Sequence, residues 1–311
     1  MEMDELVFIV GCPRTGSTLL RQILNKSERI CITSETHFMR RLSRVGRQKK
    51  LAAYGDLQDE ANVDRFLDYL YSEQQATATG YWGWFNRTVP RPRFKERLLA
   101  SDRSERAIFA LLMQVYVEAR QDLRTDMILG EKTPTNFYYV PTLYEWFPQV
   151  KIIHTFRDPR AIFISAAKLV RAGKWGVKEK LPTLPSWLMY GLLDMIELIH
   201  ITKTWLDAVR LHALYERTYG DRYYLLRFEE LVSNPEEQVQ KLCNFLNVPY
   251  DPAMLDELAV VGSSFQPQRR VKAAGLDKKT AGRWQTHIGP FAKTWFSLLG
   301  RKHLARLGYP P

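Results

Sequence analysis

The residues best suited to chemistry begin with a glycine-rich loop near the start of the chain. Residues 11–18 read GCPRTGST, directly after the apolar run LVFIV at 6–10. The residues that follow the loop have the apolar spacing of a helix. A loop between a buried strand and a helix gathers backbone N–H groups and the positive end of the helix dipole. The pattern therefore predicts an anion-binding site.

This loop differs from the phosphate loop of ATP- and GTP-hydrolysing proteins, which reads G-x-x-x-x-G-K-[ST]. Gly11, Gly16 and Thr18 keep that spacing, but Ser17 replaces the lysine and Arg14 supplies the cation instead. The missing lysine normally contacts the β- and γ-phosphates. This departure disfavours an ATPase or kinase, although an atypical P-loop kinase or NTPase stays an alternative. A strand–helix turn that merely uses glycine is the structural alternative.

A second group of polar residues lies in FRDPRAIFISA, at 156–166. Arg157 ends an expected strand, which is where an α/β sheet opens its ligand crevice. Asp158 and Pro159 suit the N-cap and first turn of the next helix, so Asp158 is not expected to bind a metal. Ser165 follows about two helical turns later. The alternative is that Arg157 pairs with a structural acid and that Ser165 is a surface hydroxyl.

Strands and helices alternate along the sequence, which predicts an α/β protein with a mostly parallel central sheet flanked by helices. The expected strands are 6–10, 30–33, 127–132, 150–156 and 222–228. The expected helices are 15–27, 107–123, 138–147, 158–171, 187–219, 234–248 and 293–307. Ser104 is the expected N-cap of the second helix. No linker or internal repeat divides residues 1–311, so we expect a single domain, with 40–100 as a helical or lid insertion.

The composition is that of an ordinary globular protein. Of the 311 residues, 45% are hydrophobic and 25% are charged, which excludes a disordered, collagen-like or fibrous chain. Lysine and arginine number 45 against 34 acidic residues, for a net charge of +11. This surplus favours an anionic partner. A basic nucleic-acid-binding protein is the alternative that charge alone suggests, but no recognised motif supports it, and we expect no nucleic-acid partner.

Cysteine usage and the apolar runs indicate a cellular compartment. Cys12, Cys31 and Cys243 cannot all pair and lack metal-ligand spacing, so we expect a reducing compartment and no metal. No apolar run approaches the ~18 residues of a membrane span. The opening MEMDELVFIVG is acidic where a signal peptide is basic. We therefore expect a cytoplasmic protein without a membrane span. The sequence leaves a homodimer open, because it does not determine the oligomeric state.

Four segments, in this order, resemble motifs of the sulfotransferases that use 3′-phosphoadenosine 5′-phosphosulfate (PAPS). PRTGSTL at 13–19 is similar to their 5′-phosphosulfate loop, and 156–166 resembles their 3′-phosphate motif, R-D-P-R-A-x-x-x-S. Residues 225–251 resemble a Y-E-D-L-V-x-x-P block with its helix, and AGRWQTHI at 281–288 resembles the G-R-W segment of bacterial members. The chain is thus similar to bacterial-type sulfotransferases, with motif similarity to tyrosylprotein sulfotransferases.

The resemblance implies a P-loop-NTPase-like sulfotransferase fold and transfer of a sulfonate group from PAPS to a hydroxyl or amine. The products would be a sulfated acceptor and adenosine 3′,5′-bisphosphate (PAP), with no metal required. The implied donor-binding residues are Arg14, Thr15, Gly16, Ser17, Thr18, Arg157, Ser165, Arg283 and Trp284. Leu169 stands where some members have a further basic residue. A structural loop anchored by a buried tryptophan is the alternative for Arg283 and Trp284.

The resemblance also implies the catalytic residues. The segment SETHF follows the second expected strand, and its Glu35 matches in spacing the general base of tyrosylprotein sulfotransferases. His37 is the alternative base, since some bacterial members use a histidine there. Lys132, in EKTP, is the implied cation on the sulfonate and bridging oxygen, together with the arginine of the first loop. The alternatives are a helix cap or salt bridge for Glu35, a satisfied surface or core histidine for His37, and a surface ion pair with Glu131 or a neighbour for Lys132. Asn136 replaces a histidine that bacterial members often have.

The sequence does not determine the acceptor, which we expect to be a small molecule, glycan or lipid. The aromatic segment YWGWF at 81–85, with Trp175 and Trp187, is interpreted either as core or as a lining for the acceptor. The basic run from Arg40 to Lys50 is a solvated face, a lid or a site for an acidic acceptor. Basic residues of the late loop are expected to steer the anionic donor: Arg269, Arg270, Lys272, Lys278 and Lys279.

Overall fold

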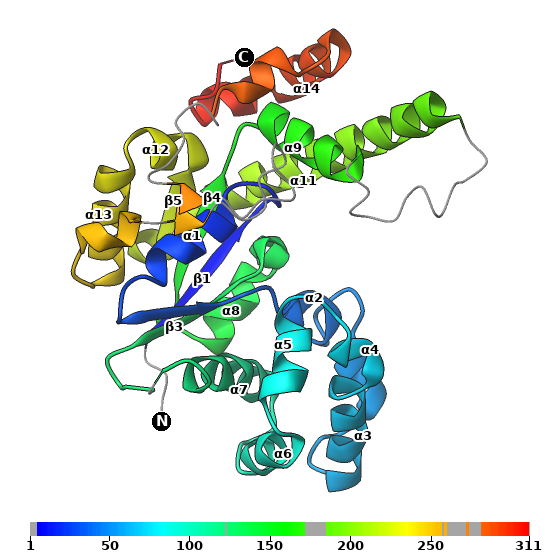
Figure 1. Ribbon diagram of the computed structural model, residues 1–311, viewed down its shortest axis with the longest axis vertical. Coiled ribbons are helices and arrows are strands. Elements are labelled where there is room, and N and C mark those ends of the chain that lie inside the picture. Colours follow the sequence, from blue (N-terminus) through cyan, green and yellow to red (C-terminus); the bar gives the residue numbers. More distant parts are fainter. Residues whose placement is uncertain are drawn as a thin grey trace. The chain divides into compact units, whose positions relative to one another are not determined.

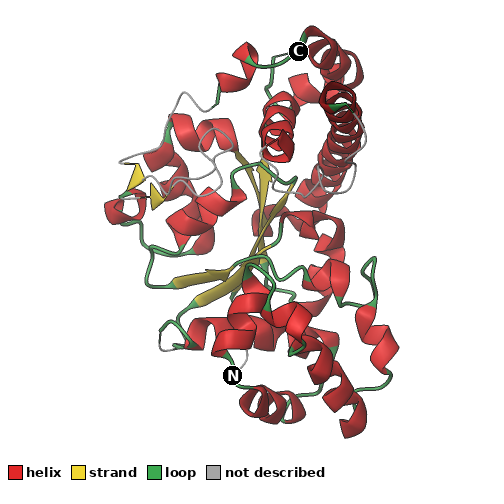
Figure 2. Cartoon of the chain, turned by 45° about the vertical axis from the view of Figure 1, so that its right-hand side comes forward, coloured by secondary structure: helices red, strands yellow, loops and turns green. Residues whose placement is uncertain are grey.

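The computed structural model describes residues 5–121, 123–171, 185–256, 258–259, 272–273 and 281–310. Strands and helices alternate along these residues, as Figures 1 and 2 show. The five longer strands form one sheet in the order β2-β3-β1-β4-β5. Their bounds are β1 Leu6–Gly11, β2 Ile30–Thr33, β3 Ile128–Lys132, β4 Lys151–Phe156 and β5 Tyr223–Arg227. Each strand predicted from the sequence is therefore present to within about one residue at either end.

The pairing around β3 fixes the positions of several candidate site residues. β3 runs parallel to both β1 and β2, and Ile9 of β1 faces Lys132 while Thr33 of β2 faces Glu131. Both neighbouring strands are fully buried, as expected for apolar strands in a parallel sheet. Gly130 is required in β3, because a Cβ atom there would lie 2.2 Å from the carbonyl oxygen of Val7. The segment after β2 therefore starts beside the end of β3.

The chain divides into two compact units, and each is described by itself. The first comprises Met1–Val10 and Leu24–Ile153, and the second comprises Gly11–Ile23 and His154–Pro311. The first unit holds β2, β3 and most of β1, together with the segment that follows β2. The second holds the glycine-rich loop, the end of β4 and the chain that follows it. The expected single domain stays a prediction.

The helices of the first unit pack on an aromatic core. They are α2 Phe38–Arg41, α3 Glu60–Leu70, α4 Glu73–Ala76, α5 Tyr81–Thr88, α6 Arg91–Leu99, α7 Glu105–Glu118 and α8 Val140–Trp146, with 3-10 turns at Lys50–Tyr54 and Pro134–Tyr139. Ser104 caps α7 as predicted, since its hydroxyl accepts a bond from the Ala107 N–H at 3.1 Å. Phe109 of α7 stacks on Phe8 and Phe38, with ring centroids 5.5 and 4.8 Å away. The stretch from 40 to 100 is largely helical, and its role as an insertion stays a prediction.

The helices of the second unit are mostly longer. They are α1 Ser17–Leu24, α9 Pro159–Arg171, α11 Ser186–Tyr219, α12 Phe228–Ser233, α13 Pro235–Leu246 and α14 Pro290–Arg306. Shorter elements are the 3-10 turns Gly220–Arg222, Pro252–Leu255 and Arg283–Thr286 and the antiparallel strands β6 Leu258–Ala259 and β7 Lys272–Ala273. The indole of Trp295 donates to the Thr202 hydroxyl at 2.9 Å, joining α14 to α11. Among the described helices, none carries an apolar stretch that would span a bilayer.

Candidate functional site

The glycine-rich loop between β1 and α1 has a backbone that only glycine can follow at two positions. Gly11 and Gly16 have φ angles of +144° and +85°. A Cβ atom at Gly11 would lie 2.3 Å from the carbonyl oxygen of Thr155, and one at Gly16 would lie 2.4 Å from the ring of Phe228. Arg14 also has a positive φ, of +73°, which costs a non-glycine residue energy. The loop is therefore a close-fitting turn whose backbone, rather than its side chains, sets its shape.

At least one hydroxyl group of this loop forms hydrogen bonds within the protein. Thr15 is buried, and its hydroxyl lies 2.7 Å from that of Thr155 and donates to the carbonyl of Cys12 at 2.8 Å. Ser17 is also buried, whereas Thr18 is half-buried. A role of Thr15 in ligand binding would therefore fall to its backbone N–H. The threonine side chain ties the loop to β4.

The structure brings three predicted donor-binding residues together in the second unit. Nε of Arg14 donates to the Ser165 hydroxyl at 2.9 Å, and Nη1 of Arg157 donates to the Arg14 carbonyl at 3.2 Å. The Arg157 guanidinium stacks over the ring of Phe228 at 4.2 Å. Burial lowers the pKa of Arg157 to about 10, against the opposing charge of Glu229. Arg157 therefore stays charged at neutral pH, and the cluster is strongly positive.

Asp158 acts as the predicted helix cap. It stands immediately before α9, and its carboxylate accepts from the Arg160 backbone N–H at 2.9 Å and from the Arg160 guanidinium at 2.8 to 3.2 Å. The other face of Arg160 lies over the ring of Trp284 at 4.3 Å. Asp158 is thus fully engaged in a buried ion pair. Within the described residues, no group of three or more His, Cys, Asp or Glu side chains could hold a metal ion.

The two late residues of the predicted donor site lie in different surroundings. Trp284 is buried against Arg160, whereas Arg283 is half-buried. Burial lowers the pKa of Lys168, and the charge of Arg283 lowers it further. Lys168 lies three residues after Ser165 on α9, so these groups share one face of the helix. Lys168 thus supplies a cation next to the predicted site, whereas the neighbouring Leu169 is buried core.

Several residues singled out in the sequence lie outside the described part of the chain. These are Trp175, Arg269, Arg270, Lys278 and Lys279. Lys272 belongs to β7. Trp187 is described at the start of α11, where 77% of it is exposed.

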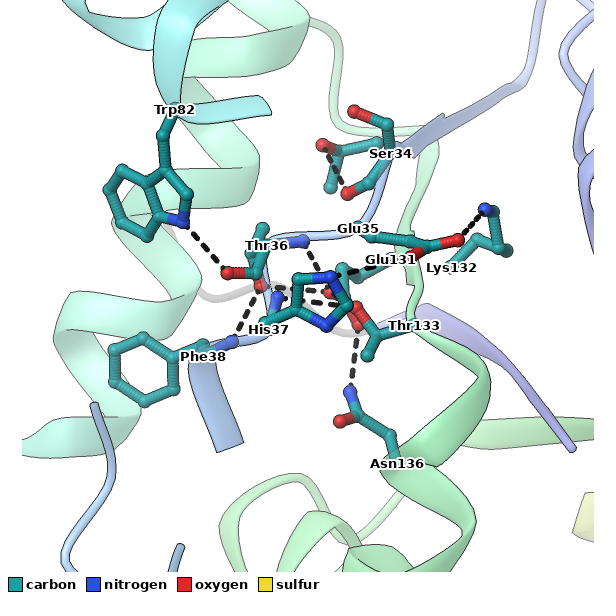
Figure 3. Close-up of polar contacts among 11 residues, drawn as sticks. Ser34, Glu35, Thr36, His37, Phe38, Trp82, Glu131, Lys132, Thr133 and Asn136 are labelled. Carbon is teal, nitrogen blue, oxygen red and sulfur yellow. Dashed lines mark hydrogen bonds and ion pairs between the residues drawn. The ribbon is translucent and has the colours of Figure 1, made fainter. Parts of the chain in front are cut away.

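In the first unit, the three predicted catalytic groups after β2 and at the end of β3 lie together (Figure 3). Oε1 of Glu35 accepts a hydrogen bond from Nζ of Lys132 at 2.5 Å, and Oε2 lies 3.4 Å from Nε2 of His37. The Lys132 side chain is only 5% exposed, whereas that of Glu35 is 39% exposed. The carboxylate is therefore reachable from solvent while its ammonium partner is not. The alternative of a surface ion pair between Lys132 and Glu131 does not hold, because both side chains are buried and Lys132 pairs with Glu35.

The imidazole of His37 is the third member of this cluster. Burial lowers its pKa, as do the charges of Arg41, Arg40 and Lys132, whereas Glu35 raises it. Nδ1 is buried and has no hydrogen-bond partner among the described residues. The His37 backbone is left-handed, with φ of 53°, and comes directly before α2. Because the pKa of His37 lies below the ordinary value of 6.5, its ring is neutral at neutral pH.

Sequence reasoning missed the buried carboxyl group behind this cluster. Glu131 is fully buried, and it accepts hydrogen bonds from the backbone and side chain of Thr36, from Thr133 and from Asn136. The only signal in the sequence is an acidic residue in an otherwise apolar buried strand. Asn136, which replaces a histidine in the motif, is a member of this network.

The aromatic segment at 81–85 forms α5 and belongs mainly to the core. Tyr81, Trp82 and Phe85 are buried. The indole of Trp82 donates to the carbonyl of Thr36 at 2.9 Å. Trp84 is half-buried beside the guanidinium of Arg120, 4.9 Å from the ring. The buried members fit the core alternative, and one of them supports the segment that carries the candidate base.

Comparison with known proteins decides the family. The model of the sulfotransferase family matches residues 6–252, which is most of the chain. The chain belongs to this family. Its sulfotransferase relatives include the omega-hydroxy-beta-dihydromenaquinone-9 sulfotransferase Stf3 of Mycobacterium tuberculosis, which is 27% identical over 79% of this chain and 63% of the relative. The nodulation protein NoeE of Sinorhizobium fredii is 26% identical over 98% of this chain and 66% of the relative. The chain thus spans just under two thirds of each relative's length.

The fold of the sulfotransferase family is also found by comparison of structures. The sulfotransferase domain of the Synechococcus olefin synthase superposes with a TM-score of 0.59, at 20% identity, over 99% of this chain and 95% of that domain. This agrees with the strand order and the parallel pairing around β3. The predicted α/β fold, with a mostly parallel sheet flanked by helices, is therefore confirmed.

Proposed function

We propose that this chain transfers a sulfonate group from PAPS to a hydroxyl or amine of an acceptor. In the reaction the acceptor oxygen or nitrogen loses a proton and forms a bond to sulfur. The bond between sulfur and the bridging oxygen breaks, and PAP leaves. The observation that carries the proposal is the carboxylate of Glu35, which lies between the Lys132 ammonium and the His37 imidazole in a chain of the sulfotransferase family.

The glycine-rich loop and α9 are assigned to the donor. The turn at Gly11 and Gly16 packs against Thr155 and Phe228 and leads directly into α1, where the backbone N–H groups and the helix dipole favour an anion such as a phosphosulfate. Arg14, Arg157 and Ser165 form one hydrogen-bonded cluster, and we assign them to the phosphates. Guanidinium groups suit this task, because they stay charged and present several donors. The residues present thus fit a doubly phosphorylated nucleotide.

Glu35 is assigned as the general base and Lys132 as the cation that offsets charge on the bridging oxygen. The Glu35 carboxylate is 39% exposed, so an acceptor hydroxyl can reach it. The Lys132 ammonium is buried, so water does not screen its charge from the leaving oxygen. Proton removal by a positioned base and neutralisation of the leaving group are what sulfonate transfer requires. The cation lies on β3, where Lys132 is in register with Ile9 of the neighbouring strand β1.

His37 is assigned a supporting role rather than that of the base. A neutral ring that carries its proton on Nε2 donates toward Glu35, which lies 3.4 Å away. The other tautomer would place an N–H at Nδ1, which is buried without a partner among the described residues, and a buried unpaired donor is costly. His37 therefore orients the carboxylate of Glu35.

A phosphoryl-transfer enzyme is the alternative that this site does not favour. Ser17 stands at the lysine position of the ATP-type loop, and the carboxylate of Asp158 is bonded to Arg160. An ATP-type site needs both a loop lysine and a metal-binding acid. With Ser17 and Asp158 in these roles, the site fits a donor that has no β- and γ-phosphates.

The acceptor class that we propose is a hydroxylated small molecule, glycan or lipid. The mycobacterial relative is an omega-hydroxy-beta-dihydromenaquinone-9 sulfotransferase, which supports the lipid member of this group. We also propose a reducing compartment, the cytoplasm, supported by Cys12, Cys31 and Cys243, each of which is a buried thiol. A homodimer and the lack of a nucleic-acid partner stay predictions.

An acceptor screen with radiolabelled PAPS tests the function. We expect transfer of label to at least one of a panel of long-chain alcohols, hydroxysteroids, phenols and oligosaccharides. In parallel, calorimetry should show micromolar binding of PAP without magnesium and none of ATP. Binding of ATP with magnesium, or steeply salt-dependent binding of DNA in place of PAP, would overturn the proposal.

A further inference from the structure

The buried carboxyl group of Glu131 has no part in the chemistry described above, yet it lies directly behind the candidate base. Its side chain is fully buried on β3, one residue before Lys132. Oε1 accepts from the Thr36 backbone N–H at 3.0 Å, from the Thr36 hydroxyl at 2.8 Å and from the Thr133 hydroxyl. Oε2 accepts from the Asn136 amide at 2.8 Å (Figure 3). Among the described residues, these partners of the carboxyl group are all hydrogen-bond donors.

A buried carboxyl group is unfavourable unless its oxygens are hydrogen-bonded. Two of the four hydrogen bonds to this carboxyl group come from a single residue, Thr36. The donors thus hold Glu131 in place, and Glu131 in turn fixes the short segment that follows β2.

Thr36 is held through all of its polar groups. Its N–H and hydroxyl bond to Glu131, and its carbonyl accepts from the Trp82 indole at 2.9 Å. Its hydroxyl also accepts from the Phe38 N–H at 3.1 Å, at the start of α2. The residues on either side of Thr36 in the sequence are Glu35 and His37. Fixing Thr36 therefore fixes the backbone from which both side chains emerge.

We propose that Glu131 is a positioning residue for sulfonate transfer, which holds Thr36 so that Glu35 faces Lys132 and His37. The catalytic part of this inference rests on the proposed function, whereas the structural part does not. Lys132 and Glu131 are neighbours on the same strand, β3. Lys132 contacts Glu35 directly, whereas Glu131 acts on Glu35 through Thr36. Displacement of a reacting group by about 1 Å can cost ~10²-fold in rate.

Two substitutions separate the shape of Glu131 from its charge. Glu131→Gln keeps a carbonyl oxygen for Thr36 and Thr133 and turns an NH₂ group toward Asn136. The Oδ1 atom of Asn136 is buried without a partner among the described residues, so rotation of that amide can accept the new donor. Glu131→Leu keeps a similar volume but removes the acceptor. The glutamine variant should therefore preserve the segment, and the leucine variant should release it.

The first measurement is turnover, using radiolabelled PAPS and an acceptor sulfated by the wild type. We expect Glu131→Leu to lower kcat by ~10²-fold while the affinity for PAP changes by less than about threefold, because the donor residues belong to other segments. Glu131→Gln should keep kcat within about tenfold. Glu105→Leu is the matched control: Glu105 also accepts from a loop, through Ser43 and the Arg44 N–H, but not from the base segment, and its kcat should not change.

The second measurement does not depend on activity. The indole N–H of Trp82, assigned in the NMR spectrum by comparison with Trp82→Phe, reports directly on the carbonyl of Thr36. We expect this resonance to shift or broaden in Glu131→Leu and to stay near its wild-type position in Glu131→Gln. If the wild type sulfates no acceptor, the proposed function fails, but this resonance still decides whether Glu131 positions the segment.

A wild-type Trp82 resonance or an unchanged kcat in Glu131→Leu would overturn the positioning role. If Glu131→Leu loses both PAP binding and the chemical-shift dispersion of its NMR spectrum, the variant is unfolded. Thr36→Val then tests whether the bond between Thr36 and Glu131 positions the base. That variant removes one hydrogen bond to Glu131 and should lower kcat by ~10-fold, with recovery in Thr36→Ser. Equal kcat values for the valine and serine variants would also reject the proposal.

Discussion

The glycine-rich loop and the base segment after β2 are both short connections that follow a buried strand, but they are held in different ways. The loop takes its shape from its backbone: Gly11 and Gly16 have positive φ angles and no room for a Cβ atom. The base segment takes its shape from side chains: Thr36 is fixed by Glu131 and Trp82. One region depends on the absence of side chains and the other on their hydrogen bonds.

This difference determines which substitutions disrupt each region. A backbone-shaped loop fails when a side chain is added, since a left-handed non-glycine residue costs about 1–2 kcal/mol even before any collision. A hydrogen-bonded segment fails when one partner is removed, because each buried polar group left without a partner destabilises the fold by about 1–3 kcal/mol. Substitutions in the loop should therefore change donor affinity, and substitutions behind the segment should change turnover.

The largest expected effect is that of Glu35→Ala. Loss of a general base should lower kcat by ~10²–10⁴-fold, whereas PAP affinity should change little, because the donor groups lie in other segments. Steady-state kinetics with labelled PAPS and calorimetry with PAP measure the two quantities. If Glu35→Ala keeps its turnover and His37→Ala loses it, His37 is the base and the assignment to Glu35 is wrong.

A second effect concerns the pH dependence of stability. Burial raises the pKa of Glu131 from 4.5 to about 7, with a smaller rise from the charge of Glu35, while the bonds from Thr36 and Thr133 lower it. The carboxyl group also faces Tyr81, whose own pKa it raises. A folded-state pKa above the unfolded value means that the folded protein holds this proton more tightly. The free energy of unfolding should therefore fall as the pH rises from about 4.5 to about 7.

The size of this effect is up to about 3 kcal/mol, from 1.36 kcal/mol per unit of pKa. Glu131→Gln removes the titration, so urea unfolding at pH 5 and pH 8 should show a smaller loss of stability in the variant than in the wild type. Parallel stability curves for the two proteins would contradict the predicted linkage.

Gly16→Ala tests the backbone-shaped region. The new methyl group needs a left-handed backbone and meets the Phe228 ring, so we expect PAP affinity to fall by ~10–100-fold, with the αL cost alone giving ~10-fold. Gly80→Ala is the matched control, because Gly80 has a similar φ of +79° but no atom within 4 Å of the added methyl. The control should leave PAP binding unchanged. Equal affinities of both variants for PAP would show that the collision with Phe228 does not matter.

Arg157→Lys tests recognition of the 3′-phosphate. The lysine cannot reproduce both the stacking on Phe228 and the bond to the Arg14 carbonyl. PAP affinity should fall by ~10-fold, an amount typical of one charge-assisted bond, and the affinity for AMP, which lacks the 3′-phosphate, should not fall. Arg120→Lys, which disrupts a guanidinium stacked on the Tyr116 ring, is the control. An equal loss for AMP and PAP would assign Arg157 to the shape of the loop instead.

The smallest expected effect is that of His37→Gln. Because His37 orients Glu35 rather than accepting the proton, we expect kcat to fall by only about 3–10-fold, the range of one lost neutral hydrogen bond. The midpoint on the acid side of the pH–kcat profile should be the same in the variant as in the wild type. A shift of that midpoint in the variant would instead place the proton on the imidazole.

The sequence by itself determined the elements and the donor motif. Its apolar runs predicted all five longer strands, and Ser104 and Asp158 marked the helix starts at which they are found. The spacing of Gly11 and Gly16 predicted a loop between a strand and a helix, and the structure adds that neither position has room for a side chain. The apolar runs and the helix caps are local signals, because they depend on residues only a few positions apart. The atoms of Thr155 and Phe228 that leave no room at the two glycines come from distant parts of the sequence.

Only the tertiary structure decided how the base segment is supported. Glu131, Thr36 and Trp82 are separated by dozens of residues in the sequence, yet they form one buried hydrogen-bonded group. In the sequence, Glu131 entered only as a partner for Lys132 in an alternative surface ion pair. In the structure, Glu131 pairs in register with Thr33 of β2 and is fully buried. A buried carboxyl group is satisfied only by the donors that the fold brings to it, and no spacing along the chain can specify which ones those are.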